Sequence, residues 1–244
     1  MIPPPQEAHA VQNQHGARAR RENEHTTTKK THVSNSCAPS HFQVHKLCQE
    51  SAAHILDNFK PHLMIAIGGG GYVPARILRS FLKKTGSPNI PIQAIGLSLY
   101  ETLSDTVVEE PGKKVTRTQW LDLTSLGEMK NLIGKKILIV DEVDDTRTTL
   151  EYAVKELEKD VEAARQKLGL EGEDAKTEFS IFVLHNKNKQ KKGTLPAEMM
   201  DNGRYMAART VGDEWICYPW EAEDIEEHDE LSRQMKAKQA NGSS

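Results

Sequence analysis

Acidic and hydroxyl side chains come directly after an apolar run, Ile137–Val140, near the middle of the chain. They are Asp141, Glu142, Asp144, Asp145, Thr146, Thr148 and Thr149, with Arg147 among the threonines. Such an apolar run is typical of a strand buried on both faces of a parallel sheet, and ligands of these sheets bind at the carboxyl ends of the strands. The threonines begin a helical pattern, and the free N–H groups at the start of a helix favour a phosphate. The stretch therefore predicts a ligand site with a phosphate subsite; a capped helix after a solvated acidic turn is the alternative.

Four consecutive glycines, Gly68–Gly71, form a second candidate site. They follow the apolar run Leu63–Ile67 and precede a helix that we expect from about Val73 to Lys84. Glycines between a strand and a helix let backbone N–H groups crowd onto an anion. No Gly-Lys-Ser/Thr follows them, so this is not a Walker loop, and the spaced glycines of a dinucleotide fingerprint are missing. The run predicts an anion-binding turn, with a plain flexible turn as the alternative.

Hydrophobic patterns predict the elements that position these two sites. Apolar residues at helical spacing from Phe42 to Phe59 predict an amphipathic helix that packs on a sheet. We expect further strands at 92–100 and 179–184, and a long helix at 150–168. The polar stretch 101–119 predicts a long loop. Strands and helices in this order favour an α/β fold with a mostly parallel central sheet flanked by helices.

Length and charge exclude several classes of protein. The chain has 244 residues, which suits one α/β domain, and its net charge of −3 argues against a protein built to bind nucleic acid. Three cysteines without paired spacing favour a reducing compartment over a disulfide framework or a zinc site. No apolar run is long enough to cross a bilayer, and a signal-peptide core is missing from the first residues. We therefore expect a cytosolic protein that binds neither nucleic acid nor membranes.

The two ends of the chain differ in composition from the stretch between them. Residues 1–40 are rich in polar residues and proline and predict a disordered tail. This tail contains three arginines, Arg18, Arg20 and Arg21. They are either a weak patch for localisation or nucleic-acid binding, or simply part of a solvated tail. We expect the folded domain at 41–232 and a second disordered tail at 233–244.

Both candidate sites resemble motifs of the type I phosphoribosyltransferases. Residues 137–149 resemble the family's motif for phosphoribosyl pyrophosphate (PRPP), which has four apolar residues, two acids, two variable residues, Asp-Thr, and small or hydroxyl residues. Residues 68–76 match its pyrophosphate loop: two variable residues, Gly-Gly, two apolar residues and Pro. From 42 to about 230, the chain is similar to the fungal 6-oxopurine phosphoribosyltransferases. The resemblance implies the type I phosphoribosyltransferase fold with a small C-terminal hood, mainly at 195–225.

The implied reaction transfers the 5-phosphoribosyl group of PRPP to N9 of hypoxanthine or guanine and releases pyrophosphate, with Mg²⁺ as the cofactor. Xanthine is the alternative base. Remoter alternatives are a non-enzymatic regulator with the same fold and a plain nucleotide-binding module. The family also implies a homodimer.

The resemblance assigns roles to the acidic stretch. Asp145 would be the acid/base residue near N7 of the purine, while Asp141 and Glu142 would hold the ribose hydroxyls and Mg²⁺ and Glu221 would assist at the metal. The residues expected to bind PRPP are Gly69, Gly70, Asp141, Glu142, Asp144, Asp145, Thr146, Arg147, Thr148, Thr149 and Arg117. Asp144 is expected to point away from the other acids. Gly69 stands where relatives often carry a basic residue, so it would contact phosphate through its backbone. Arg147 replaces a commoner glycine, and its side chain either points outward or contacts phosphate.

Three residues are implied to bind the purine. Lys187, after the strand at 179–184, would contact the 6-oxo group; the alternative is that it only begins a basic connector. Trp215 would stack over the base while the Ile216 backbone reads its edge, unless Trp215 and Trp220 only fill a small core.

Basic residues in the polar stretch 101–119 have an implied role as well. Arg117, and less firmly Lys113 and Lys114, would neutralise pyrophosphate from a flexible lid; a solvated basic loop is the alternative. His185 is expected to be structural.

Overall fold

The computed structural model describes residues 36–101, 110–121 and 132–241. The chain divides into two units, Met1–Ser36 and Cys37–Ser244, and every element except the first residue of β1 lies in the second unit. No described helix is both long and apolar enough to cross a bilayer.

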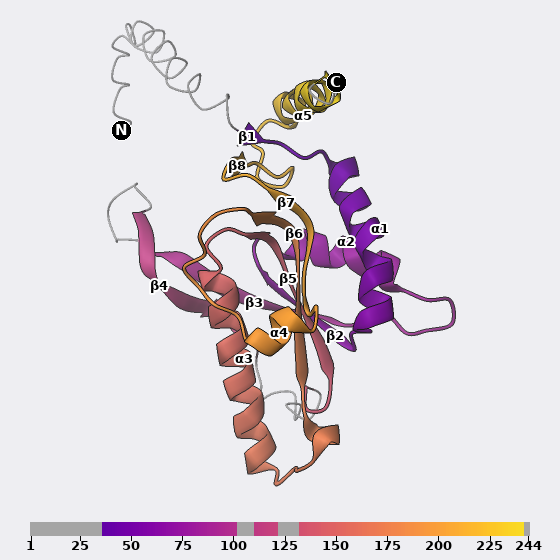
Figure 1. The fold of residues 1–244 in the computed structure, drawn as a ribbon, viewed down its shortest axis with the longest axis vertical. Helices are drawn as coiled ribbons and strands as arrows, with labels where there is room; N and C mark the ends of the chain where they lie inside the picture. Colours follow the sequence, from indigo (N-terminus) through magenta and orange to yellow (C-terminus); the bar gives the residue numbers. More distant parts are fainter. Residues whose placement is uncertain (1–35, 102–109, 122–131, 242–244) are drawn as a thin grey trace, which may run out of the picture. The chain divides into compact units, whose positions relative to one another are not determined.

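A six-stranded sheet forms the centre of the described part of the second unit, with the strand order β4-β3-β2-β5-β6-β7 (Figure 1). Its strands are β2 (Leu63–Gly68), β3 (Ile92–Glu101), β4 (Glu110–Gln119), β5 (Lys136–Asp144), β6 (Glu178–Lys187) and β7 (Tyr205–Val211). All neighbouring pairs are parallel except β3 and β4. The predicted mostly parallel sheet is therefore confirmed. Val140 of β5 pairs with Ala66 of β2 and with Phe182 of β6, so the carboxyl ends of these three strands lie side by side.

Helices cover both faces of this sheet. Helices α1 (His41–Asn58) and α2 (Tyr72–Leu82) pack on one face, and α3 (Thr148–Lys167) packs on the other (Figure 1). Successive residues of β5 alternate between the two cores: Leu138 and Val140 join the α1/α2 side, while Ile137 and Ile139 join the α3 side. All four are fully buried, which explains the unbroken apolar run that precedes the acidic stretch.

Two predictions about loops and tails are wrong in part. The predicted loop at 101–119 contains β4, which pairs antiparallel with β3. The predicted C-terminal tail at 233–244 is helical as far as Asn241, because α5 spans Ile225–Asn241. At the other end, residues 36–40 are described too, and β1 (Ser36–Cys37) pairs with β8 (Trp215–Ile216). Residues 1–35, including the arginine patch, lie outside the described residues.

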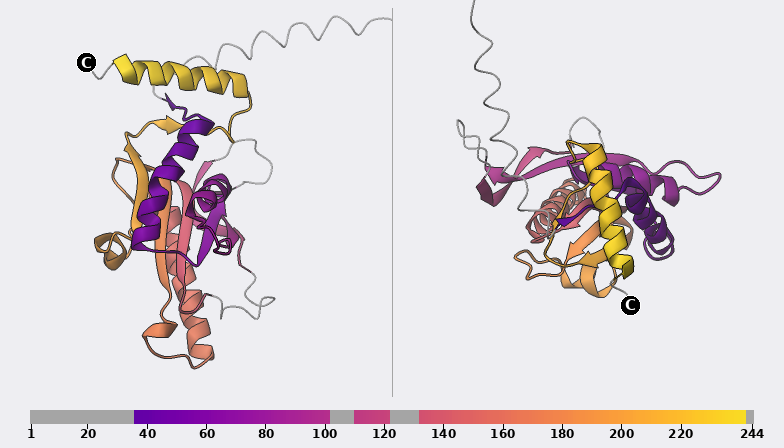
Figure 2. Two further views of the ribbon diagram at one scale, coloured as in Figure 1. Left: turned by 90° about the vertical axis from the view of Figure 1, so that its right-hand side faces the viewer. Right: turned by 90° about the horizontal axis from the view of Figure 1, so that it is seen from above.

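Tertiary contacts explain why α5 forms from so charged a sequence. Its residues are mostly good helix formers, and a few of them contact the start of α1 (Figure 2). The Ser232 hydroxyl donates to the Gln43 side chain at 3.3 Å, and the Ala38 N–H lies 3.1 Å from the Met235 sulfur. The predicted hood region at 195–225 contains α4 (Ala197–Asp201), β7 and β8, none of which the sequence patterns had marked.

Candidate active site

The glycine run and the acidic stretch lie against each other at the carboxyl ends of β2 and β5. A methyl group placed on Gly70 would collide with the carboxylate of Glu142, and one on Gly71 would collide with the carbonyl oxygen of Val140. A methyl group on Gly69 would meet nothing within 4 Å. The missing side chain at Gly70 is therefore what lets the turn approach Glu142.

Two carboxyl groups at this edge are strongly perturbed. Burial, and next the charge of Glu221, raise the pKa of Glu142 to about 7, although its Oε2 accepts a hydrogen bond from Trp220 Nε1 at 2.7 Å. Burial, and next the charge of Glu142, raise the pKa of Asp141 to about 8. Like charges are crowded here in a half-buried place, an arrangement that a bound cation stabilises.

The oxygen donors of this cluster fit Mg²⁺. Among the described residues, no group of three or more His, Cys, Asp or Glu side chains forms a metal site by itself. Mg²⁺ commonly takes one or two carboxylates from the protein and its other ligands from substrate phosphates and water. Asp141 and Glu142, with Glu221 close enough to raise the pKa of Glu142, match that pattern.

Asp144 lies beneath this edge in a network of its own. Its carboxylate is 1% exposed and accepts hydrogen bonds from the Tyr205 hydroxyl at 2.6 Å and from Arg147 Nε at 3.0 Å. Lys191 Nζ lies 3.4 Å from its other oxygen and also donates to the backbone carbonyls of Asp144 and Asp145. The expectation that Asp144 points away from the other acids agrees with this burial. This network occupies the Asp144 side chain, and the predicted contact of Asp144 with PRPP stays a prediction.

Replacing Asp144 with asparagine is expected to lower the free energy of unfolding by about 3 kcal/mol, since it leaves the half-buried Arg147 and Lys191 without their counter-charge. Urea denaturation measures this loss. Asp229→Asn is the control, because Asp229 pairs with Arg233 in an exposed position and its loss should change stability by no more than about 0.5 kcal/mol. Equal effects of the two substitutions would contradict a structural role for the Asp144 network.

Arg147 takes neither of the two positions considered for it. Its φ of +69° is in the left-handed region, which glycine adopts without strain. The side chain turns inward, with its guanidinium 4.9 Å from the centre of the Tyr205 ring and its NH2 group 2.9 Å from Asp144. The side chain therefore supports the turn from below.

The turn itself presents free backbone groups. Arg147 is the N-cap of α3 and makes no side-chain cap, so the first amides of α3, at Thr148 and Thr149, remain available to an anion. The backbone N–H groups of Lys192 and Gly193 donate to the Thr146 carbonyl at 2.9 and 3.0 Å and brace the turn from outside. The predicted phosphate subsite therefore lies at a helix start that has no side-chain cap.

Asp145 is the acid of the stretch that faces two lysines. Its side chain is 45% exposed and lies 2.8 Å from Lys189 Nζ and 3.5 Å from Lys187 Nζ. Burial alone would raise the pKa of Asp145, but the hydrogen bond from Lys189 and the charge of Lys187 outweigh it and hold the pKa below its usual range. At neutral pH the group is a carboxylate, the form that can accept a proton. Lys189 also pairs with Asp213 at 2.7 Å.

The C-terminal aromatic residues divide between surface and core. Trp215 is 69% exposed, so its ring is free to stack on a ligand, and the neighbouring Ile216 is buried. Trp220 stacks on Tyr218, with ring centres 4.8 Å apart and planes 8° apart. The core-filling alternative thus describes Trp220 better than Trp215.

Arg117 is not brought to the acidic edge. It forms ion pairs with Glu156 and with Asp160 of α3, and its guanidinium lies 4.0 Å from the centre of the Trp120 ring. Lys113 and Lys114 belong to β4, but their side chains lie outside the described part. Arg117 therefore joins β4 to α3 through these ion pairs.

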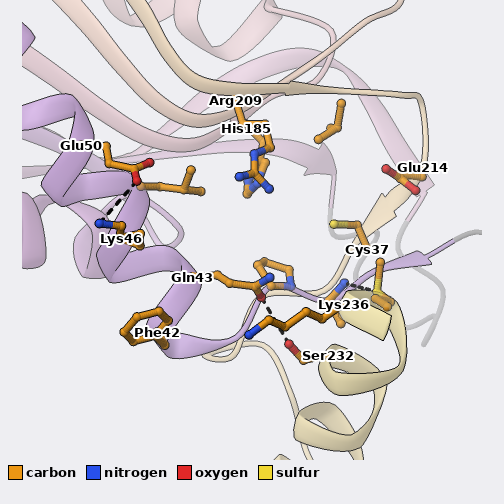
Figure 3. A pocket seen from close by; sticks show the side chains of 15 residues that line it. Cys37, Phe42, Gln43, Lys46, Glu50, His185, Arg209, Glu214, Ser232 and Lys236 are labelled. Carbon is orange, nitrogen blue, oxygen red and sulfur yellow. Dashed lines mark hydrogen bonds and ion pairs between the residues drawn. The ribbon is translucent and has the colours of Figure 1, made fainter. Parts of the chain in front are cut away.

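A cavity of about 230 Å³ lies elsewhere, between α1, β7 and α5 (Figure 3). Its lining includes Phe42, Lys46, His185, Arg209 and Lys236 but none of the residues predicted to bind PRPP, purine or metal. The candidate active site is therefore the polar edge where β2, β5 and β6 end.

Several residues that complete this edge escaped sequence reasoning. They are Tyr205, Lys191, Gly193 and Tyr218. Lys191 was visible only as part of a basic connector, and Tyr205 begins a strand that the hydrophobic pattern did not reveal. Their contacts join segments far apart in the chain, which no local pattern records.

Comparison with known proteins agrees with the motifs, although no protein-family model matches the chain. The chain is 60% identical over 197 residues to xanthine phosphoribosyltransferase 1 of Saccharomyces cerevisiae, covering 80% of this chain and 93% of that protein. It is 60% identical over 191 residues to the hypoxanthine-guanine phosphoribosyltransferase of Schizosaccharomyces pombe, covering 78% and 91%. The purine phosphoribosyltransferase of Pyrococcus horikoshii Ot3 has the same fold, with a TM-score of 0.52 at 22% identity over 78% of this chain and 97% of that one. The chain belongs to the purine phosphoribosyltransferase family.

Proposed function

We propose that this protein is a Mg²⁺-dependent 6-oxopurine phosphoribosyltransferase that converts hypoxanthine or guanine and PRPP into the nucleotide and pyrophosphate. The observation that carries the proposal is the meeting of the glycine turn with Glu142 beside Asp145 and its lysine partners. These groups lie on three neighbouring strands, β2, β5 and β6, as the parts of one extended substrate require.

Each strand end supplies one part of the site. The amides of the glycine turn bind the pyrophosphate, and those at the start of α3 bind the 5′-phosphate. The carboxylates of Asp141 and Glu142 hold the ribose hydroxyls and the metal-bound pyrophosphate. When bound, Mg²⁺ supplies positive charge to the leaving pyrophosphate.

Charge explains the roles of the remaining residues. As the bond between ribose and pyrophosphate breaks, the ribose becomes positive and N9 of the purine attacks C1 of the sugar. The purine must then lose a proton, which the Asp145 carboxylate accepts near N7. Lys187, an ammonium that can only donate, contacts the 6-oxo group and disfavours the 6-amino group of adenine. Trp215 stacks on the purine, and the Ile216 backbone reads its edge.

The choice among 6-oxopurines rests on the residues around Ile216. Similarity to the two fungal relatives is the same, 60% in each case, although one is named for xanthine and the other for hypoxanthine and guanine. Xanthine is therefore the second candidate base. A homodimer in the cytosol, as is usual in the family, is part of the proposal.

One assay tests the proposed reaction. The full chain is incubated with PRPP, Mg²⁺ and each of guanine, hypoxanthine, xanthine and adenine, and released pyrophosphate is measured. We expect release with at least one 6-oxopurine, none with adenine, and none with any base after EDTA removes the metal. Failure to release pyrophosphate with any base would overturn the proposal.

A further inference from the structure

A single turn of the chain holds Glu142 by both its main chain and its side chain. The Tyr218 hydroxyl donates to the Glu142 backbone carbonyl at 2.9 Å, and Trp220 Nε1 donates to the Glu142 carboxylate at 2.7 Å. The turn is closed by Glu221, whose carboxylate accepts a hydrogen bond from the Tyr218 N–H at 2.9 Å. The stacked rings of Tyr218 and Trp220 keep the two donors in a fixed relation.

His185 fixes the Tyr218 hydroxyl from the other side. Tyr218 is 1% exposed, and burial raises the pKa of its hydroxyl, so the hydroxyl stays protonated. Its one proton is used in the hydrogen bond that it donates to the Glu142 carbonyl. The contact of 2.9 Å with His185 Nδ1 then requires the imidazole to donate. Burial, and next the charge of Arg209, lower the pKa of His185 to about 4, so the ring that donates is neutral. Figure 3 shows His185 beside Arg209 on the wall of the cavity, at the outer end of this series of hydrogen bonds.

We propose that His185, Tyr218 and Trp220 form a positioning network that sets the orientation of Glu142 for the metal-bound pyrophosphate. The proposal rests on the proposed function and adds residues to which no role in binding or catalysis was assigned. A carboxylate on a flexible side chain binds well only when its orientation is fixed beforehand, and displacement of a positioned group by 1 Å can cost about 100-fold in rate. The network holds both the backbone carbonyl and the side-chain carboxylate of Glu142 through contacts within the protein.

The same turn also ties Glu142 to the purine side of the site. Trp215 and Ile216 come just before Tyr218, and the neighbouring Cys217 N–H donates to the Cys37 carbonyl at 2.8 Å, which anchors this stretch. A displacement of the stretch by a bound purine would act on Glu142 through Tyr218 and Trp220. The network therefore connects purine recognition with the grip on pyrophosphate.

Three variants of the full chain test the network by isothermal titration with Mg²⁺ and pyrophosphate. Tyr218→Phe removes only the hydroxyl, and Trp220→Phe removes the indole donor to the carboxylate while it keeps an aromatic ring beside Tyr218. We expect each to raise the Kd for magnesium pyrophosphate by about fivefold to tenfold, the usual net effect of one hydrogen bond. Ser180→Ala is the matched control, because it also removes a buried hydroxyl that donates to a backbone carbonyl, that of Arg204 at 2.7 Å, but away from the acidic edge. The Kd of Ser180→Ala for magnesium pyrophosphate should stay within about twofold of wild type, because the substitution removes no contact at the acidic edge.

His185 supplies a test by conservative replacement. His185→Asn keeps a donor near the position of Nδ1 and should retain most of the pyrophosphate affinity, whereas His185→Phe should lose it as Tyr218→Phe does. In steady-state assays the network variants should raise the KM for PRPP.

The outcomes separate the network from the proposed function. Folded Tyr218→Phe and Trp220→Phe proteins that bind magnesium pyrophosphate as tightly as wild type would overturn the network, and so would an equal loss in Ser180→Ala. A wild-type protein that binds magnesium pyrophosphate but releases none from PRPP with any base would overturn the function alone. A wild-type protein that binds no magnesium pyrophosphate would overturn both.

Discussion

Replacing Asp145 with asparagine is expected to lower kcat by about 100-fold to 10,000-fold, the usual contribution of a general base, and to leave the KM for PRPP within about threefold. Asparagine has nearly the same shape as aspartate but cannot accept the purine proton. The two lysines beside Asp145 hold its pKa below the usual range, so the wild-type group is ready to accept a proton at neutral pH. Initial rates at varied PRPP and fixed guanine measure both quantities.

Asp213 offers a matched control for this substitution. It lies 2.7 Å from the same Lys189 that pairs with Asp145 but carries no proposed role in the reaction. Asp213→Asn should therefore change kcat by no more than about threefold, as expected for an exposed ion pair. Equal losses in the two variants, or an equal fall in kcat and in PRPP affinity for Asp145→Asn, would contradict the proton-transfer role.

Replacing Gly70 with alanine is expected to lower kcat/KM for PRPP by about 100-fold or more, because the new methyl group must push either the glycine turn or the Glu142 carboxylate out of place. Both groups are proposed to bind the pyrophosphate end of PRPP, so a shift of either lowers the affinity for PRPP. The loss should also be seen in the Kd for magnesium pyrophosphate, measured without catalysis.

Gly69 supplies the comparison within the same turn. A methyl group there meets nothing within 4 Å, and the backbone N–H that is proposed to contact phosphate remains. Gly69→Ala should keep kcat/KM within about threefold of wild type, as for a substitution without a clash. If both variants lose activity to the same degree, then backbone freedom throughout the turn matters more than the approach of Gly70 to Glu142.

Local patterns in the sequence predicted the parts of the fold that local physics determines. The apolar run of β5 and the turn after β2 are continuous in sequence, so strand, turn and helix could be predicted in order. The glycine turn and the acidic stretch were expected to lie together because the carboxyl ends of parallel strands share one edge of the sheet. The helix α1 followed from its apolar spacing and ends within one residue of the prediction.

The features that the sequence did not predict depend on contacts between residues far apart in the chain. Asp144 owes its burial to Tyr205 and Lys191, and Trp220 owes its orientation to Glu142. Arg117 was predicted at the pyrophosphate because the polar stretch 101–119 resembles the family's flexible lid, whereas the pairing of β4 with β3 places Arg117 against α3. The part of α5 from 233 onward was predicted as a tail because its sequence is charged, and the few contacts that hold α5 are made with residues near the start of α1.

The order of the strands has a consequence for how base preference diversifies in this family. Pyrophosphate, ribose phosphate and purine are assigned to the ends of β2, β5 and β6, which follow one another across the sheet. The residues proposed to read the base edge, Trp215 and Ile216, come late in the chain, and the turn after them holds Glu142 through Tyr218 and Trp220. Exchange of this late segment between relatives would therefore change the choice of base and the position of Glu142 together.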